Sequence, residues 1–129
     1  IRDSYYVYDI DTITDWNMAQ EYCEAQGGYL ATITSQEEND FLFSYMKQEG
    51  YSSAYFGFSD SANEGTWTWC NGEQSSYTNW HSGEPNNENQ SENYALFYYK
   101  YSDGSWNDGD FGNKTDNDGT AFICEWGEY

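Results

Sequence analysis

The sequence predicts a single α+β domain with two helices, several short strands and one long loop. Three observations lead to this prediction. Apolar residues recur at helical spacing in two segments before residue 50, and short aromatic runs typical of strands dominate after it. Residues 71–93 contain mostly Asn, Glu, Ser and Gly and show no periodicity. The 129 residues suit one compact domain, so residues 1–129 are treated as one unit.

The chain is expected to open with a strand over residues 5–8, followed by a helix. Asp15 can cap the N-terminus of that helix, and Gly27-Gly28 should end it. Residues 29–33 then fit a short extended segment. One face of the helix should carry three side chains toward the core, namely Trp16, Ala19 and Cys23.

A second helix is expected to begin after Ser35. The run Ser35-Gln36-Glu37-Glu38 has the form of a capping box, in which the Ser and the last Glu each bond a backbone N–H group. Gly50 is expected to follow the last turn. The apolar stripe of this helix consists of Phe41, Leu42, Tyr45 and Met46.

The second half is expected to contain four short strands, over residues 55–58, 66–69, 94–101 and 121–126. Asp103-Gly104 offers a turn after the third of them. Residues 71–93 form the long loop, and loops of this length in compact domains are usually functional or disordered. Trp80 and Pro85, the only proline, favour an ordered loop.

The charge balance is strongly acidic. Four Lys and Arg stand against 23 Asp and Glu, which gives a formal net charge of -19. This charge disfavours nucleic acid and anionic membrane surfaces as partners and favours cations. No apolar run is long enough to cross a bilayer and the first residues lack signal-peptide character, so no membrane insertion is expected. The 14 Tyr, 7 Phe and 6 Trp can fill a core, which argues against disorder.

Three cysteines allow at most one disulfide within the chain. A bond between Cys23 and Cys124 would close a loop of about 100 residues and would be worth roughly 4 to 5 kcal/mol through the lost entropy of the unfolded chain. Such a bond would indicate an oxidising compartment. The count alone leaves the pairing open, and Cys70 is the expected odd cysteine.

Oxygen-bearing side chains crowd the end of the long loop. Asn107-Asp108 follow Trp106 in what is expected to be a second short loop. Calcium takes six to eight oxygen ligands from carboxylates, amides and backbone carbonyls, so the two loops could meet around one ion. A cis peptide bond before Pro85 would direct its two neighbours to the same side. The candidate ligands of the long loop are Glu84, Asn86, Asn87, Glu88 and Glu92.

An alternative is that Asn and Asp occur in these loops because they satisfy turns. That interpretation is preferred for Asn63, Asn71, Asn89 and Asn117. An EF-hand is excluded, since no Asp-x-Asp-x-Asp-Gly run precedes a Glu at the required distance. From the residues alone, calcium binding and ordinary turns both remain open.

The order of several short motifs resembles that of a C-type lectin-like domain over nearly the whole chain. A lone Glu-Pro-Asn would be a weak signal, but Glu-Pro-Asn followed by Glu92 and then Trp-Asn-Asp is specific. The segments that carry the resemblance are Trp16 to Cys23, Gly27-Gly28-Tyr29-Leu30-Ala31, Phe56-Gly57-Phe58, Trp80, Gly83-Glu84-Pro85-Asn86, Trp106-Asn107-Asp108 and Cys124-Glu125.

The resemblance implies one calcium ion whose open positions take two neighbouring sugar hydroxyls. Carboxylates would accept hydrogen bonds from the hydroxyls, and Asn NH2 groups would donate hydrogen bonds to the hydroxyl oxygens. Family members with Glu-Pro-Asn tend to take mannose, glucose, N-acetylglucosamine or fucose, so a mannose-type sugar is expected. The side chains that the resemblance assigns to both ion and sugar are Glu84, Asn86, Glu92, Asn107 and Asp108.

The resemblance also implies a possible second calcium ion. Two of its ligands are amides where acids are common in the family, and the lost charge should weaken the site. The positions are Asp60, Glu64, Asn87 and Glu92, with a further contact at Asn93. The family pattern further pairs Cys23 with Cys124 and leaves Cys70 free or linked outside the domain.

The chain departs from the family pattern at a second disulfide, whose positions fall on Tyr94 and Phe111. Packing between these two rings could substitute for it, and the loops should then depend more on calcium for order. N-glycosylation sequons begin at Asn89 and Asn113. A glycan on the first would obstruct the site, which points to a source without this modification, such as a bacterial surface protein.

Two other classes of function compete with sugar binding. The same fold can bind proteins or ice and keep calcium only for loop order. A glycoside hydrolase using Glu84 and Asp108 is disfavoured, because carboxylates saturated by calcium cannot serve as an acid of raised pKa. His81 is the sole histidine, and no zinc or nucleophile-elbow motif is present. We therefore expect a non-enzymatic, extracellular domain, secreted or on a cell surface, that binds glycans of cell surfaces or glycoproteins.

Overall fold

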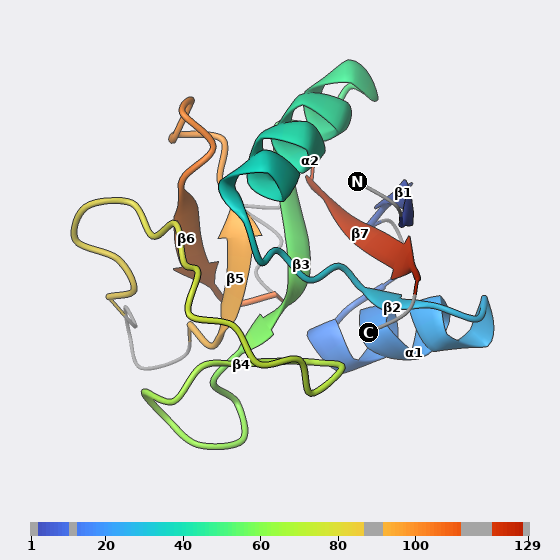
Figure 1. Cartoon of the computed structure of the whole chain (residues 1–129), viewed down its shortest axis with the longest axis horizontal. Helices are drawn as coiled ribbons and strands as arrows, with labels where there is room; N and C mark the ends of the chain where they lie inside the picture. Colours follow the sequence, from blue (N-terminus) through green and yellow to red (C-terminus); the bar gives the residue numbers. More distant parts are fainter. Residues whose placement is uncertain (1–2, 11–12, 87–91, 112–119, 128–129) are drawn as a thin grey trace.

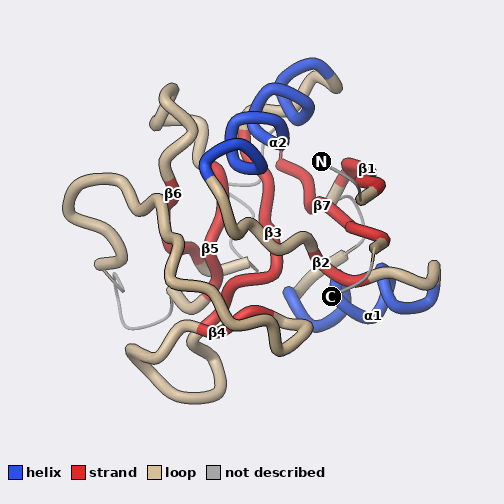
Figure 2. The backbone as a smooth tube through the Cα atoms, in the orientation of Figure 1, coloured by secondary structure: helices blue, strands red, loops and turns tan. Residues whose placement is uncertain are grey.

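The computed structural model describes residues 3–10, 13–86, 92–111 and 120–127. These ranges contain two helices and one sheet of seven strands (Figures 1 and 2). In chain order the elements are β1 (Ser4–Asp9), α1 (Trp16–Ala25), β2 (Tyr29–Leu30), α2 (Gln36–Gln48), β3 (Ser53–Ser59), β4 (Thr68–Trp69), β5 (Tyr94–Phe97), β6 (Trp106–Gly109) and β7 (Thr120–Trp126).

The sheet runs in the order β1-β7-β3-β5-β6, with β2 on β7 and β4 on β3. All of these pairs are antiparallel except β3 with β7, which is parallel. The prediction of an α+β fold with two helices is confirmed, and the expected antiparallel pairing holds for every pair but this one. Because β1 and β7 pair from Ser4 with Trp126 onward, the first and last strands of the chain lie side by side.

Both helices begin at the predicted caps. The Asp15 carboxylate accepts a hydrogen bond from the backbone N–H of Met18, and the Ser35 hydroxyl accepts one from that of Glu38. The capping box differs from its expected form, because the Glu38 carboxylate accepts from the backbone N–H and hydroxyl of Thr34, each at 2.9 Å. This carboxylate therefore ties the start of α2 to the segment that leads out of β2.

The core lies on both faces of the sheet, because successive strand residues point to opposite sides. Phe56 and Ile123 belong to a cluster with Leu42 and Met46 of α2. Their neighbours in the same strands, Tyr55 and Phe122, belong to a second cluster that contains the buried face of α1. As predicted, that face consists of Trp16, Ala19 and Cys23. Figure 1 shows the two helices on opposite sides of the central strands.

The predicted stripe of α2 is only partly correct. Leu42 and Met46 are fully buried, and Tyr45 is partly buried against the core. Phe41 is 46% exposed, whereas the polar Asn39 is fully buried. The amide of Asn39 is buried because it has hydrogen-bond partners on the β6 side of the core, which helical periodicity does not reveal.

Three strand predictions need correction. The segment expected over residues 94–101 is a strand only as far as Phe97, since Tyr101 N–H bonds Tyr98 carbonyl and residues 99–100 form a turn. The strand expected over residues 66–69 is limited to β4. Asn107-Asp108, expected in a loop, lie within β6 and pair with β5. A half-buried strand is recognised in a sequence by alternating apolar residues. Asn107 and Asp108 are polar and lack this alternation, so the sequence did not indicate the strand.

Cys23 and Cys124 form the predicted disulfide across 101 residues, with their Cα atoms 5.5 Å apart. The bond joins α1 to β7, which strengthens the α1 face of the core. Cys70 is free and half-buried, and its thiol lies 3.2 Å from the carbonyl of Leu30. Neither helix in the described part of the chain is long and apolar enough to cross a membrane.

Candidate metal centre

Two segments far apart in sequence meet at the predicted site. Residues 79–86 run beside the start of β6, where the Trp106 backbone N–H donates to the Asn79 carbonyl at 2.8 Å. The His81 backbone N–H returns a bond to the Trp106 carbonyl at 2.9 Å. These two bonds place Glu84 beside Asp108.

The Trp106 indole anchors this meeting point to the core. Its Nε1 donates to Oδ1 of Asn39 at 2.6 Å, and Nδ2 of Asn39 donates to the Gly104 carbonyl at 3.0 Å. The Asn79 side chain donates to the same Gly104 carbonyl at 3.0 Å. One buried amide of α2 and one amide of the long loop thus hold the turn before β6, so the site rests on the rigid part of the molecule.

Three of the candidate ligands, Glu84, Asn86 and Asp108, are neighbours in the structure. The Glu84–Pro85 peptide bond is cis. The Asn86 backbone N–H donates to Oδ1 of Asp108 at 3.1 Å. Oε2 of Glu84 accepts a hydrogen bond from the Tyr101 hydroxyl at 2.6 Å. Asn107 precedes Asp108 on β6, and both side chains are buried.

The site concentrates negative charge. Burial raises the pKa of Glu84, and the neighbouring Asp108 carboxyl raises it as well, while the hydrogen bond from Tyr101 lowers it. Glu84 is half-buried and Asp108 is fully buried, and two carboxylates held side by side in this way repel each other. A cation between them would remove that repulsion, which is the electrostatic condition for a metal site.

Two buried oxygens of the site have no hydrogen-bond partner among the described residues. They are Oε1 of Glu84 and Oδ1 of Asn107. A buried acceptor without a donor is costly, and the groups left in this state here are the oxygen types that calcium prefers. The residues present therefore fit a calcium ion.

Glu92, the remaining predicted ligand, is half-buried and lies two residues before β5, the strand that pairs with β6. No group of three or more His, Cys, Asp or Glu side chains within the described ranges could hold a metal ion. The candidate site is thus not an all-acid cluster, because two of its five candidate ligands, Asn86 and Asn107, are amides.

Four of the five candidate residues of a second calcium site lie among the described residues, namely Asp60, Glu64, Glu92 and Asn93. The Asp60 backbone N–H donates to the Asn93 backbone carbonyl at 3.2 Å, so the two residues are neighbours across the β3–β5 side of the sheet. Asp60 is 2% exposed, and its Oδ1 and that of Asn93 lack hydrogen-bond partners within the described chain. Glu64 is exposed on the adjacent turn, while Asn87 lies outside the described residues. Two oxygens of this second site are therefore buried without a hydrogen-bond partner, like those of Glu84 and Asn107 at the first site.

The expected contact between Tyr94 and Phe111 is replaced by two other ring contacts. Tyr94 stacks on Trp16 with ring centres 5.4 Å apart, and Phe111 packs on Tyr55 at 4.5 Å. Both rings belong to the cluster on the α1 face of the core, Phe111 as a buried member and Tyr94 as a partly buried one. The sequons at Asn89 and Asn113 lie outside the described residues.

Comparison with known proteins decides the family. The family model of the Lectin C-type domain matches residues 12–126. The chain belongs to the C-type lectin domain family.

Three known proteins illustrate the relationship of this lectin domain to others. A perlucin-like protein of Mytilus galloprovincialis is 36% identical over 100 residues, which span 73% of this chain and 61% of that protein. The carbohydrate-recognition domain of cow CD23, solved in the presence of a GlcNAc2Man3 oligosaccharide, has a TM-score of 0.79 at 29% identity and covers 100% of this chain and 91% of its own. A calcium-independent type II antifreeze protein has a TM-score of 0.74 at 26% identity, with coverage of 97% and 86%.

Sequence reasoning missed the residues that support the site of the lectin domain. The sequence predicts a strand that includes Tyr101, and Asn39 was not among the residues singled out. The signal for Asn39 was its position among buried stripe residues of α2, where a polar side chain needs a partner. No sequence signal distinguishes Tyr101 from its neighbours, because Tyr98 and Tyr99 precede it.

Proposed function

We propose that this C-type lectin domain binds carbohydrate through a calcium ion held by five side chains. The five are Glu84, Asn86, Glu92, Asn107 and Asp108. The observation that carries the proposal is the pair of buried, unsatisfied oxygens on Glu84 and Asn107, which lie on two segments joined at the start of β6. An oxygen-rich site with excess negative charge calls for a hard cation.

The same side chains can serve the sugar. Calcium, when bound, would offer coordination positions to two neighbouring hydroxyl oxygens of the sugar. The carboxylates of Glu84 and Glu92 would accept hydrogen bonds from those hydroxyls, while the amide NH2 groups of Asn86 and Asn107 would donate hydrogen bonds to their oxygens. Asn86 is exposed, so a ligand can reach the site from solvent.

The expected class of sugar follows from the residue types in the Glu84-Pro85-Asn86 motif. With Glu at position 84 and Asn at position 86, we expect mannose-type sugars, in agreement with the mannose-containing oligosaccharide named for the CD23 structure. This sugar specificity implies glycans of cell surfaces or glycoproteins as partners. The domain would act outside the cell, and it would bind these glycans without catalysing a reaction. The chain spans 61% of the length of the perlucin-like protein, so the role of a whole protein is part of this proposal.

A second calcium ion is proposed at Asp60, Glu64, Asn87, Glu92 and Asn93. The unsatisfied Oδ1 atoms of Asp60 and Asn93 support it. Because the two amides carry no charge, this ion should bind more weakly than the first.

The first prediction tests the principal site. Calorimetric titration of metal-free protein should detect calcium, and mannose immobilised on a surface should retain the protein only when calcium is present. Asp108→Asn removes one charge with little change of shape and should weaken calcium binding at least about tenfold, since affinity follows the charge count of the ligands. Asp40→Asn, on the exposed face of α2, is the matched control and should bind as the wild type does.

A change in sugar selectivity tests the assigned sugar-binding residues directly. Members of the family with Gln-Pro-Asp in place of Glu-Pro-Asn tend toward galactose. Glu84→Gln combined with Asn86→Asp should therefore shift preference from mannose toward galactose while calcium binding persists. Mannose binding that survives this double change would contradict the assigned sugar site, because the two changed side chains would then not contact the sugar.

Binding to a protein or to ice without sugar is the second candidate function. The similarity to a structure described as a calcium-independent antifreeze protein favours it. A partner that remains bound in excess chelator, together with a flat calcium titration, would establish this candidate and reject the first.

A further inference from the structure

Tyr101 makes a contact with the candidate site that family membership does not assign. It is half-buried just beyond the turn that follows β5, where its backbone N–H bonds the Tyr98 carbonyl at 2.9 Å. Its hydroxyl donates to Oε2 of Glu84 at 2.6 Å, a short hydrogen bond between a phenol and a carboxylate. Seventeen residues of sequence separate the two side chains, so tertiary structure alone creates the contact.

The ring of Tyr101 is held on two sides. His81 stacks on it with ring centres 3.7 Å apart and planes 5° from parallel. Tyr98 packs against it edge-on at 5.4 Å. The hydroxyl is therefore directed at Glu84 by a ring with little freedom to rotate.

A hydrogen-bond chain holds His81 in turn. The Ser105 hydroxyl donates to Oδ1 of Asp103 at 2.5 Å, and the Ser105 backbone N–H donates to the same oxygen at 3.0 Å. Because an ionised carboxylate only accepts, the Ser105 hydroxyl must give its proton to Asp103. Nδ1 of His81, 2.7 Å from that hydroxyl oxygen, then carries the proton of the imidazole and donates.

We infer that Tyr101 is a positioning residue for the calcium ligand Glu84, an inference that rests on the proposed function. By occupying Oε2, the Tyr101 hydroxyl sets the rotation of the carboxylate and leaves the unsatisfied Oε1 for the ion. A carboxylate offers about four acceptor positions, so Oε2 keeps one for a sugar hydroxyl. The Asp103-Ser105-His81 chain keeps the tyrosine ring in place.

The need for such a device follows from the charges at the site. Asp108 lies beside Glu84, and without a cation their repulsion favours rotation of the Glu84 side chain toward solvent. A donor fixed on one oxygen opposes that rotation. Partners that orient metal ligands typically contribute a factor of about 10 to 100 in metal affinity.

The test compares calcium titrations of the wild type, Tyr101→Phe and Tyr99→Phe. Tyr101→Phe keeps the ring and its stacking on His81 but removes the hydroxyl, and should weaken calcium binding about tenfold. Tyr99 is 50% exposed, so Tyr99→Phe removes a phenol hydroxyl from the same turn and should change the affinity less than twofold.

Two further readouts separate positioning from a structural role. Mannose affinity at saturating calcium should remain within about threefold of wild type in Tyr101→Phe, whereas a damaged loop would lose both affinities. The rise in melting temperature on adding calcium should shrink, while the melting temperature in chelator changes little. If the wild type binds calcium and Tyr101→Phe binds it equally well, or melts lower in chelator by as much as in calcium, the inference is overturned. If the wild type does not bind calcium, the proposed function fails and this inference fails with it.

Discussion

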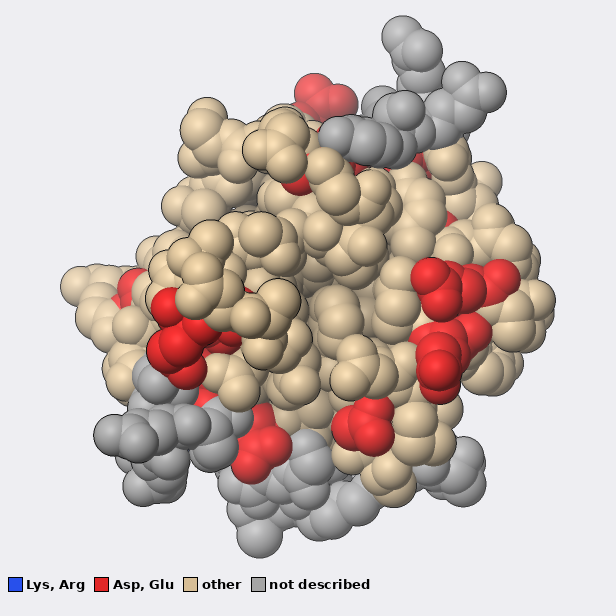
Figure 3. Space-filling model, turned by 90° about the horizontal axis from the view of Figure 1, so that it is seen from below, with Lys and Arg blue, Asp and Glu red and all other residues tan. Residues whose placement is uncertain are grey.

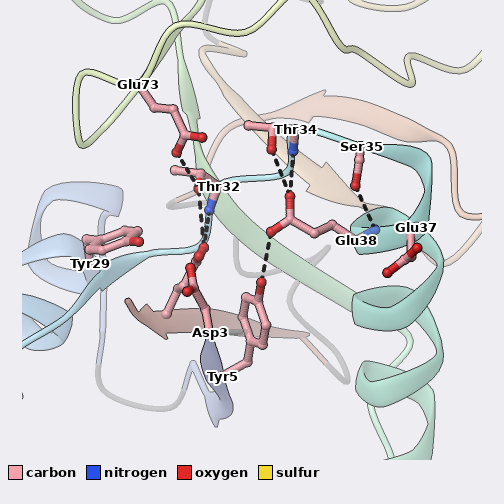
Figure 4. Close-up of a pocket in the computed structure, with 10 residues that line it drawn as sticks. Asp3, Tyr5, Tyr29, Thr32, Thr34, Ser35, Glu37, Glu38 and Glu73 are labelled. Atoms are coloured by element: carbon pink, nitrogen blue, oxygen red, sulfur yellow. Dashed lines mark hydrogen bonds between the residues drawn. The ribbon is translucent and has the colours of Figure 1, made fainter. Parts of the chain in front are cut away.

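Glu125 follows the disulfide cysteine on β7 and carries a carboxyl group that is almost fully buried, with 1% of the residue exposed. The Thr32 backbone N–H donates to its Oε1 at 2.9 Å. It lines a hollow of about 300 Å³ together with four other acids, Asp3, Glu37, Glu38 and Glu73. Figure 4 shows this hollow between the segment after β2 and the start of α2. Burial, reinforced by the hydrogen bond with Asp3, raises the pKa of Glu125 to about 9.

This raised pKa makes the stability of the protein depend on pH. Between the ordinary carboxyl pKa near 4.5 and about 9, the folded state binds a proton that the unfolded chain releases. Stability contributed by Glu125 is therefore fully present below about pH 4.5 and is lost as the pH rises through about 9.

The second prediction replaces the ionisable group. Gln at position 125 imitates the protonated carboxyl and can still accept from Thr32, so Glu125→Gln should raise the melting temperature in chelator at pH 8 by about 3–8 °C. The two proteins should converge as the pH falls toward about 4.5. Glu21→Gln on the exposed face of α1 is the control and should leave the melting curve unchanged. A constant difference across pH 5–9 would show that Glu125 does not titrate in this range.

At the scale of elements, the contact between α2 and β6 determines whether the site is preformed. The Asn39 side chain makes two hydrogen bonds across this contact: it accepts one from the Trp106 indole and donates one to the Gly104 carbonyl. Both Trp106 and Asn39 are fully buried, so neither partner can turn to water for a replacement bond.

The third prediction removes this contact. Asn39→Ala leaves a buried indole N–H and a carbonyl without partners, at a cost of about 1–3 kcal/mol in the free energy of unfolding. Denaturant titration in chelator measures the loss. Asn17→Ala, an exposed substitution on α1, should cost less than about 0.5 kcal/mol. Calcium affinity should fall in Asn39→Ala as well, and unchanged affinity would show that the site does not depend on this anchor.

At the scale of the whole molecule, charge is the dominant property. The formal net charge of -19 is spread over a surface on which Asp and Glu gather in several patches, and no Lys or Arg among the described residues is visible on the face in Figure 3. Self-repulsion of this kind destabilises a compact state. Salt weakens it, because the screening length falls to about 10 Å at 0.1 M.

The fourth prediction follows from this balance. In chelator at pH 7, raising NaCl from low concentration to 0.5 M should raise the melting temperature by an amount on the order of 5 °C. Near pH 4, close to the isoelectric point of about 4.1, the net charge is near zero and the same salt should have little effect. An equal response at both pH values would attribute the gain to general salting-out and not to repulsion among the acids.

The local parts of the fold were predictable because their causes are local. Asp15 and Ser35 cap helices through bonds to residues three positions away, and the buried face of α1 follows from its period. The strand β6 was not predictable in the same way, because Asn107 and Asp108 owe their strand conformation to pairing with β5. The exposure of Phe41 depends likewise on which side of α2 the sheet covers.

The sequence by itself determined the fold class, the disulfide partners by resemblance, and the identity of the candidate ligands, because each is recorded in the order and type of residues along the chain. Tertiary structure alone decided that Glu84 lies beside Asp108, that Asn39 holds Trp106, and that Tyr101 donates to Glu84. The reason is physical: orientation and burial arise from contacts between segments that are distant in sequence, and no local pattern encodes the partner that each buried polar group will meet.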